Sequence, residues 1–362
     1  MAAQNDSVPS PEGSAPSNAS GKRVHARPLV IASAALFIGV GALIAGIGLA
    51  GSARDGGPSI SLELAPFPSA GEVGAVLPSM SFRSLREIGG HLIADPVLIE
   101  DSPQGPLPQI APDGRAPMTA YGGGFDRNDK RPKIALVIRG LGVGGNTTAL
   151  ALDRLTPAVT LAFTPFAEEL QSNIDKARGV GHEVLIEVPM EPFDFPDSDP
   201  GPHALLVAAS AEENGKRLDW ALSRATGYTG VMNLLGGRFM GEKSAIEPVL
   251  DHVARRGLLF FDNGANSSSI AITAARHVKA PIAIGTLTLD GVQTQDAIDA
   301  KLAELETAAR QDGFAIGVGS AYPITIARAA EWALSAEARG FQLAPVSALT
   351  TITGAGKVAN SE

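Results

Sequence analysis

The chain has 362 residues, of which 44% are hydrophobic and 19% are charged, so it is long enough and apolar enough to bury a large core. A net charge of -9, without any Lys/Arg-rich stripe that contains aromatic residues, argues against nucleic acid as a partner. The chain has no cysteine, which excludes disulfides, thiolate nucleophiles and Cys-ligated zinc. The composition indicates one large domain with appended segments.

The N-terminal part of the chain predicts a membrane anchor. Residues 1–28, rich in Ser, Pro, Asn and Gly over most of their length, are expected to form a disordered cytoplasmic tail. Residues 29–51 carry no charge and consist mainly of Leu, Ile, Val, Ala and Gly. About 20 apolar residues suffice to cross the hydrocarbon core as a helix, so this stretch is a transmembrane candidate.

The charges around residues 29–51 predict the orientation of the anchor. Lys22, Arg23 and Arg27 precede the apolar stretch, whereas Arg54 and Asp55 nearly cancel after it. By the positive-inside rule, the chain is a single-pass inner-membrane protein with a cytoplasmic N-terminus and a periplasmic C-terminal domain. A cleaved signal peptide is the alternative, but the apolar stretch exceeds the usual h-region of about 7–15 residues.

Two further segments are expected to lack regular structure. Residues 52–131 are rich in Pro and Gly, with only brief apolar patches, and predict a linker that tethers the domain to the membrane. Residues 350–362 are expected to form a disordered tail.

Short apolar strands and amphipathic helices alternate over residues 132–349, which predicts a parallel α/β sheet with right-handed crossovers. About seven such units favour a distorted (β/α)7-type barrel over an open doubly wound sheet. Strands are expected near residues 133–139, 158–163, 182–188, 229–233, 258–262, 282–285 and 313–318, and a final apolar segment covers residues 341–346. Helices are expected near residues 145–155, 167–180, 211–225, 243–256, 267–277, 294–312 and 323–338.

Two kinds of site are poorly supported. Gly140, Gly142 and Gly145 match a dinucleotide fingerprint, but the expected acidic residue about 20 positions later is missing, and a tight turn explains these glycines without a cofactor. No two of the six histidines lie at i, i+3 or i, i+4, the spacing of a metal clip on a helix. The sequence therefore predicts no cofactor and no metal ligands.

Polar residues follow the predicted strands, where ligands meet such a fold. Asp262 and Glu191 are the catalytic candidates, and the ligand-binding candidates are Arg139, Glu187, Asn233, Arg238, Asn263 and Ser320. These side chains suit hydrogen bonds to sugar hydroxyls, or an anchor for a phosphate or carboxylate. The alternative is a structural salt-bridge network of Glu187, Arg139 and Arg238.

The domain resembles the divergent polysaccharide deacetylases, and the similarity covers about residues 132–349 in order. The matching segments are Lys133-Ile-Ala-Leu-Val-Ile with Leu141-Gly142, Val159-Thr-Leu-Ala-Phe163 with Pro165, Gly181-His-Glu-Val-Leu185, Pro189-Met-Glu-Pro192, Pro200-Gly-Pro202, Gly236 with Arg238-Phe239, Arg256-Gly-Leu258 with Asp262, and Ala315-Ile-Gly317 with Tyr322-Pro323. The resemblance implies a distorted barrel, divalent-metal chemistry in active members, and acetyl groups of envelope or extracellular glycans as substrates.

The departures from the family pattern concern the chemistry. Active-looking members end the first strand with two aspartates, where this chain has Arg139 and Gly140. Three histidine positions are occupied by Leu234, Glu187 and Ser320, and Asp262 alone matches the expected polar positions. A metal that activates water needs about three protein ligands, so the resemblance implies that the usual metal site is degenerate.

The sequence thus predicts a membrane-anchored, envelope-facing protein that acts in carbohydrate metabolism through glycan binding or as a scaffold, that is, a pseudoenzyme. An active hydrolase is the first alternative, in which Glu187, Glu191 and Asp262 form a rearranged acidic site, with a divalent metal or with one protonated carboxylate. The second alternative is a protein-interaction module with a vestigial pocket. An envelope polysaccharide, the inner membrane and a protein are the partners considered.

Overall fold

The computed structural model describes residues 85–88 and 91–350. The predicted tail and membrane anchor (1–28 and 29–51), the first part of the predicted linker (52–84) and residues 351–362 lie outside the described residues. Within the described ranges, no helix is long and apolar enough to cross a membrane.

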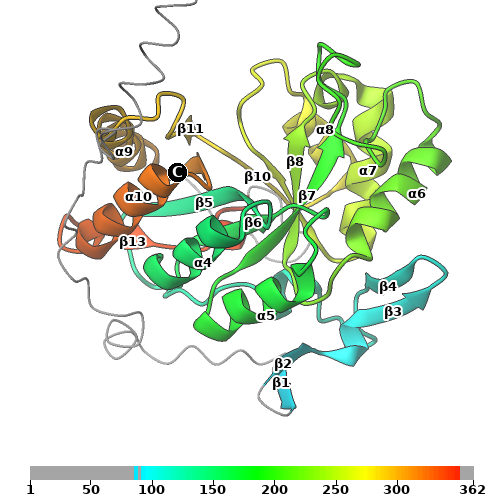
Figure 1. Cartoon of the computed structure of the whole chain (residues 1–362), viewed down its shortest axis with the longest axis horizontal. Coiled ribbons are helices and arrows are strands. Elements are labelled where there is room, and N and C mark those ends of the chain that lie inside the picture. Colours follow the sequence, from blue (N-terminus) through cyan, green and yellow to red (C-terminus); the bar gives the residue numbers. More distant parts are fainter. Residues whose placement is uncertain (1–84, 89–90, 351–362) are drawn as a thin grey trace, which may run out of the picture. The chain divides into compact units, whose positions relative to one another are not determined.

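The main element of the fold is a parallel sheet that is flanked by helices (Figure 1). Its strands in the described part of the chain are β5 (Lys133–Leu141), β6 (Thr160–Phe163), β7 (Val184–Met190), β8 (Gly230–Leu235), β9 (Leu259–Asp262), β10 (Ile282–Ile284), β11 (Leu287–Thr288), β12 (Phe314–Ser320) and β13 (Gln342–Leu343). The hydrogen-bonded order is β10-β9-β8-β7-β6-β5-β12-β11, and β13 pairs with the start of β5. The architecture is a parallel-strand α/β half-barrel.

The two edge strands of this half-barrel are consecutive in the chain. Residues 282–284 pair with β9, and residues 287–288 pair with β12 on the other edge. Between them, Gly285 donates its N–H to the Asp262 carbonyl and Thr286 donates to the Ile316 carbonyl. One extended segment, residues 282–288, therefore connects the two edges of the sheet.

The helices follow the predicted alternation, with bounds that differ from the expected ones by a few residues. They are α4 (Gly145–Arg154), α5 (Leu170–Val180), α6 (Ala211–Leu222), α7 (Lys243–Arg255), α8 (Ala271–Val278), α9 (Gln295–Asp312) and α10 (Pro323–Ala336), with short 3-10 turns η2 (Phe239–Gly241) and η3 (Val346–Leu349). Local signals explain their ends: Ser210 and Glu213 form a capping box before α6, and Gly181 adopts a left-handed conformation after α5.

Side-chain alternation along the strands separates two apolar layers. Ile134, Leu136 and Ile138 of β5 belong to the large cluster that includes the helices. The intervening residues Ala135 and Val137 belong to a second cluster inside the half-barrel, together with Ala162, Leu185, Met232, Leu259, Phe261, Ala283, Ile316, Val318, Val346 and Leu349. Because successive side chains of a strand point to opposite faces, this second cluster identifies the inward-facing positions of each strand.

Residues 94–131, which the sequence assigns to the linker, are ordered and belong to the domain. They contain η1 (Pro96–Leu98), the hairpin of β3 (Ile99–Ser102) and β4 (Gly105–Pro108), and the short helix α3 (Pro117–Ala120). A further hairpin, β1 (Leu85–Ile88) with β2 (His91–Ala94), precedes them. We call residues 94–131 the N-terminal arm. The Pro and Gly residues of this arm make turns around a small core, which includes the buried residues Leu98 and Tyr121.

The arm contacts the domain through hydrogen bonds to its backbone. Arg178 Nη1 donates to the Tyr121 carbonyl at 2.9 Å, and Gln342 Nε2 donates to the Asp126 carbonyl at 2.7 Å. The prediction of a flexible linker is therefore wrong for residues 94–131, and the folded domain begins before residue 132.

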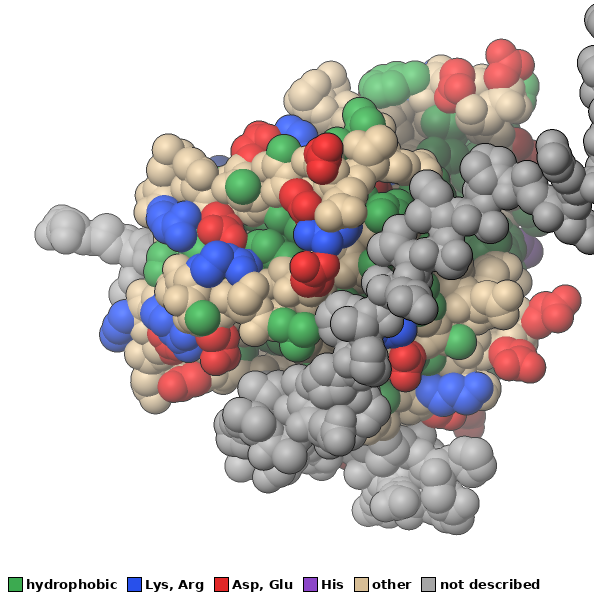
Figure 2. Space-filling model, turned by 60° about the vertical axis from the view of Figure 1, so that its left-hand side comes forward, with side chains coloured by type: hydrophobic (Ala, Val, Ile, Leu, Met, Phe, Trp, Pro, Cys, Tyr) green, Lys and Arg blue, Asp and Glu red, His purple; other side chains and the backbone are tan. Residues whose placement is uncertain are grey.

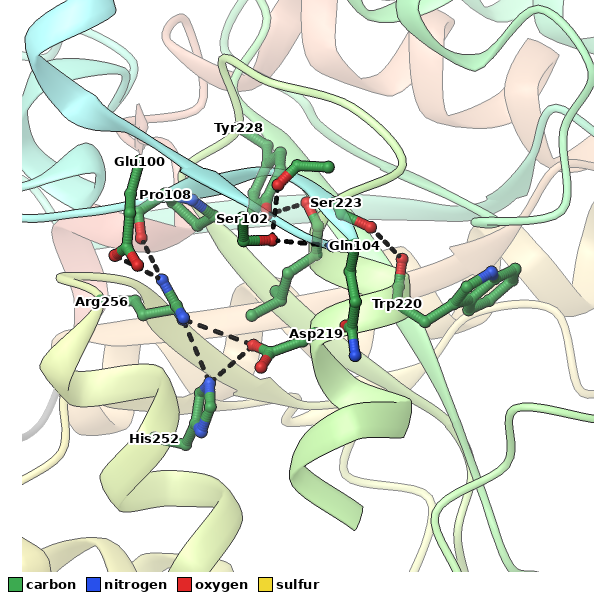
Figure 3. Close-up of polar contacts among 12 residues, drawn as sticks. Glu100, Ser102, Gln104, Pro108, Asp219, Trp220, Ser223, Tyr228, His252 and Arg256 are labelled. Atoms are coloured by element: carbon green, nitrogen blue, oxygen red, sulfur yellow. Dashed lines mark hydrogen bonds and ion pairs between the residues drawn. The ribbon is translucent and has the colours of Figure 1, made fainter. Parts of the chain in front are cut away.

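A charged cluster joins the β3–β4 hairpin to α6 and α7 (Figure 3). Arg256 Nη1 donates to the Pro108 carbonyl at 3.0 Å and lies 3.4 Å from a Glu100 oxygen. His252 Nε2 lies 2.8 Å from Asp219 Oδ1 and 3.1 Å from Arg256 Nε. Since this nitrogen either donates to Asp219 or accepts from Arg256, it serves one partner at a time. His252 is thus a structural histidine.

The described part of the face in Figure 2 carries interspersed acidic and basic side chains. No continuous basic area is visible there, in keeping with the net charge of -9.

Candidate functional site

The carboxyl ends of the strands and the loops after them form one edge of the half-barrel, which we call the mouth. Arg139 continues the inward-facing row of Ala135 and Val137 on β5, and Ser320 continues the row of Ile316 and Val318 on β12. On β7, Glu187 continues the row of Leu185. The structure therefore brings three of the predicted site residues, Arg139, Glu187 and Ser320, to the inward-facing side of the mouth.

Glu187 is the buried carboxylic acid of this group, with only 1% of its surface exposed. Its Oε1 accepts a hydrogen bond from the Gly140 N–H at 3.0 Å. Burial raises the pKa of Glu187 to about 7, although the Arg139 charge and the Gly140 hydrogen bond act in the opposite direction. Near neutral pH, Glu187 therefore exists in both protonation states.

Arg139 is half-buried and pairs in register with Ser320 of β12. Among the described residues, its guanidinium has no hydrogen bond and no salt bridge within 4.0 Å. Its nitrogens are not among the buried polar atoms that lack a hydrogen-bond partner. A salt-bridge network of Arg139, Glu187 and Arg238 is therefore not formed in the described structure. The positive charge of Arg139 remains available to a ligand at the mouth.

Asp290, after β11, was not identified from the sequence. Its Oδ2 accepts from the Ser320 N–H at 2.6 Å and from the Thr325 hydroxyl at 3.0 Å. It thereby fixes the end of β12, next to Arg139. The signal for it was weak, because the two-residue strand β11 is too short to show a hydrophobic period.

Glu191 lies in the loop after β7 and connects two other loops. Its Oε1 accepts from Arg238 Nη1 at 2.7 Å, and its Oε2 accepts from the Val207 N–H at 2.7 Å. Glu191 is buried, whereas the Arg238 side chain is 55% exposed. Both carboxylate oxygens are therefore used to hold the loops around β7 and β8.

Asp262, Asn233 and Asn263 also have structural partners. Asp262 accepts from the Gly264 N–H at 3.0 Å and from the Ser269 hydroxyl at 2.6 Å. It lies between Phe261, which faces inward, and Asn263, so its position in the strand belongs to the outer row. Asn233 Oδ1 accepts from the Asn263 N–H at 2.8 Å, and Asn263 Oδ1 accepts from the Ala265 N–H at 2.9 Å. The catalytic assignment of Asp262 and Glu191 stays a prediction.

The glycines at the end of β5 and directly after it have a conformational explanation. Gly140 and Gly142 have φ values of +77° and +92°. A Cβ on Gly142 would lie 2.6 Å from the Cβ of Ala167, so the chain needs glycine there for close packing.

Large hydrophobic side chains are exposed around the mouth. Six of them lie at or after the carboxyl ends of six different strands: Val143, Phe166, Phe193, Leu235, Val292 and Tyr322. We call these six residues the rim. Val143 is 81% exposed and Phe193 is 68% exposed. The rim was not predicted, because single apolar residues in loops carry no periodic signal.

The profile of the divergent polysaccharide deacetylases matches residues 136–350, which include the whole sheet apart from the first residues of β5. This chain belongs to the divergent polysaccharide deacetylase family. An uncharacterized protein from Agrobacterium tumefaciens C58, ATU2773, has a crystal structure that is 40% identical in sequence, with a TM-score of 0.66. The similarity covers 68% of this chain and 99% of that protein. The uncharacterized protein YibQ of Escherichia coli K12 is 24% identical over 194 residues, which is 54% of this chain and 60% of YibQ.

The residues of this divergent polysaccharide deacetylase do not fit the divalent metal that the resemblance implies. Within the described ranges, no group of three or more His, Asp or Glu side chains is arranged to hold a metal ion. Glu187, Glu191 and Asp262 each bond to different partners, and Arg139 places a cation on the inward-facing row next to Glu187. A Lewis-acid step therefore has no ligand set at this mouth.

Proposed function

We propose that this member of the divergent polysaccharide deacetylase family is anchored in the membrane and binds an envelope glycan at the mouth. In this proposal, the protein does not remove acetyl groups from the glycan by metal catalysis. The observation that carries the proposal is the inward-facing row itself, which presents Arg139, Glu187 and Ser320. The anchor rests on the sequence of residues 29–51.

The charge of Arg139 opposes cation binding at this position. A divalent cation and a guanidinium repel each other, and the repulsion is strong where buried apolar side chains lower the effective dielectric constant. Val137 and Val318 are buried neighbours of this kind in the same inward-facing rows. Guanidinium and hydroxyl groups instead suit the hydrogen-bond acceptors and donors of a sugar.

The rim supplies surfaces suited to the apolar faces of sugar rings. Phe193 lies against the backbone of Gly237, where a Cβ would come within 2.6 Å of the phenyl ring. One side of the ring is thus fixed by the protein while 68% of the residue remains exposed. An exposed, positioned aromatic face provides contact area at little cost in conformational entropy.

A protein partner is the second candidate, and the rim favours it as well. Three of the rim residues, Val143, Leu235 and Val292, are aliphatic, and exposed apolar side chains often mark a protein interface. The glycan is preferred because Arg139, on the inward-facing side of the mouth, supplies a directional polar group.

The test is glycan binding by the purified full-length chain, measured by co-sedimentation with insoluble cell-wall glycan and with chitin. Phe193→Ala is compared with Leu334→Ala, since Leu334 is also exposed but lies on the outer helix α10. We expect binding that is weakened at least about tenfold by the first substitution and unchanged by the second. No binding to either glycan, or equal binding by both variants, would overturn the proposal.

A second assay tests the rearranged hydrolase. The chain is incubated with acetylated oligosaccharide and Zn²⁺, Co²⁺, Mn²⁺ or Ni²⁺, and acetate release is measured for wild type and for Asp262→Asn. We expect no acetate above the level without protein. Release that requires Asp262 would show an enzyme with a rearranged acidic site.

A further inference from the structure

Arg139 is a charged residue at the mouth for which the described structure shows no structural role. The other charged side chains there are engaged: Glu191 binds Arg238, Asp290 binds the end of β12, and Glu187 accepts from Gly140. The Arg139 guanidinium has no hydrogen bond or salt bridge in the part of the chain that the structure describes. A half-buried guanidinium without such a partner favours binding of an anion.

We propose that the glycan bound at the mouth is anionic and that Arg139 binds its oxyanion. This inference rests on the proposed glycan-binding function and goes further, because it names the chemical class of the sugar. A guanidinium offers parallel N–H donors that match the two oxygens of a carboxylate or a phosphate. The rim would then contact the sugar ring that carries the oxyanion.

The acidic side chains near Arg139, namely those of Glu187 and Asp290, differ in how far they can offset its positive charge. On β7, Glu187 interacts electrostatically with Arg139, and burial raises the pKa of Glu187 to about 7, so its charge is reduced near neutral pH. Next to β12, Asp290 is held by the Ser320 N–H and the Thr325 hydroxyl. On the other side of Glu187, its register partner in β8 is the uncharged Met232. Glu187 is therefore the titrating group that can modulate the field at Arg139.

The protonation of Glu187 sets the sign of the pH dependence. Below about pH 7 Glu187 is mainly neutral, and Arg139 presents a full positive charge to the ligand. Above this pH the ionised carboxylate competes with the ligand for Arg139. The affinity for a sugar carboxylate, which is fully ionised throughout this range, should therefore fall as the pH rises from 6 to 8, whereas the affinity for a neutral sugar should not change.

The experiment compares sugars that differ only in charge. The full-length chain is titrated at pH 6 with a short oligosaccharide that carries a carboxylate, with the same oligosaccharide converted to its amide, and with a phosphorylated one. We expect the carboxylated or phosphorylated form to bind at least about tenfold more tightly than the amide. The form that binds more tightly identifies the oxyanion.

Three substitutions locate the effect. Arg139→Gln should bring the anionic and neutral sugars to the same affinity, while Arg255→Gln makes the same charge change on the exposed part of α7 and should leave the preference intact. Glu187→Gln should keep the preference and remove its pH dependence. Melting curves check that Arg139→Gln still folds, which we expect since no hydrogen bond to the guanidinium is lost.

The outcomes separate this inference from the function on which it depends. Equal binding of anionic and neutral sugars by the wild type would overturn the inference and leave glycan binding in place. A preference that persists in Arg139→Gln would also overturn it. No binding of any sugar would overturn both, and capture of a protein at the rim would then identify the alternative partner.

Discussion

Two glutamates of the same segment, Glu183 just before β7 and Glu187 within it, show how differently the two ends of the half-barrel use an inward-facing carboxyl group. At the amino end, Glu183 is fully buried and accepts from the Ser347 N–H, the Thr160 hydroxyl and the Gly123 N–H, at 3.1, 3.2 and 3.3 Å. At the carboxyl end, Glu187 accepts a single hydrogen bond among the described residues, from the Gly140 N–H at 3.0 Å. The comparison teaches that one end is closed by the protein's own chain, while the other leaves polar groups for a ligand.

The difference between the ends comes from what covers them. The N-terminal arm supplies Gly123, and η3 supplies Ser347, so residues far apart in sequence meet at Glu183. The rim residues cover the mouth only at its margin and stay exposed. Burial raises the pKa of both glutamates, but the number of hydrogen-bond donors differs.

Removal of the amino-end carboxyl group should have the largest effect on stability. Glu183→Ala leaves three donors without their acceptor, each at a cost of roughly 1–3 kcal/mol, and we expect a loss on the order of 4 kcal/mol in the free energy of unfolding. Urea denaturation measures it. Glu183→Gln keeps one acceptor oxygen and should lose less; equal losses would contradict a role through these hydrogen bonds.

At the mouth, substitution of the buried glutamate is expected to increase the free energy of unfolding. The folded-state pKa of Glu187 is raised from 4.5 to about 7, so the folded protein loses stability as the pH rises from 4.5 towards 7 and the loss stays constant above. Glu187→Gln should therefore be more stable than wild type at pH 8, by on the order of 3 kcal/mol, and nearly equal at pH 4.5. Denaturation curves at several pH values measure this. A difference that does not change with pH would show that burial of the charge is not the cause.

Asp262 should behave as a structural residue of intermediate importance. Asp262→Asn replaces a charged acceptor of the Ser269 hydroxyl by a neutral one, with an expected loss of about 1–2 kcal/mol. Glycan affinity should remain unchanged. Loss of binding without loss of stability would place Asp262 in the site after all.

The rim should affect binding and leave stability almost unchanged. Phe193→Ala removes a ring that is 68% exposed, so its effect on the free energy of unfolding should be below about 0.5 kcal/mol. Thermal melts of this variant and of Leu334→Ala provide the comparison. A large loss of stability in Phe193→Ala alone would mean that the ring serves the packing of the loop against Gly237.

The sequence predicted the strands and helices well, because apolar runs such as residues 133–139 and 182–188 leave little choice of structure. It failed for the N-terminal arm, since Pro and Gly that form tight turns have the same composition as a flexible linker. Among the site residues, the sequence did not distinguish Arg139 and Glu187, which face inward, from Asp262 on the outer row and Glu191 in a loop. One position along a strand decides whether a side chain faces the interior. Because the residues on both faces of β7 and β9 are buried, the sequence shows no alternation from which the facing side could be read.

The segment of residues 282–288 has a mechanical consequence for whatever binds at the mouth. Since its first half pairs with β9 and its second half with β12, the two edges of the sheet cannot move apart without stretching a covalent chain or breaking at least one of these two sets of hydrogen bonds. The distance across the mouth is therefore nearly fixed. A ligand therefore has to match a preformed spacing between Arg139 and the rim. Selectivity would then arise from the shape of a rigid site.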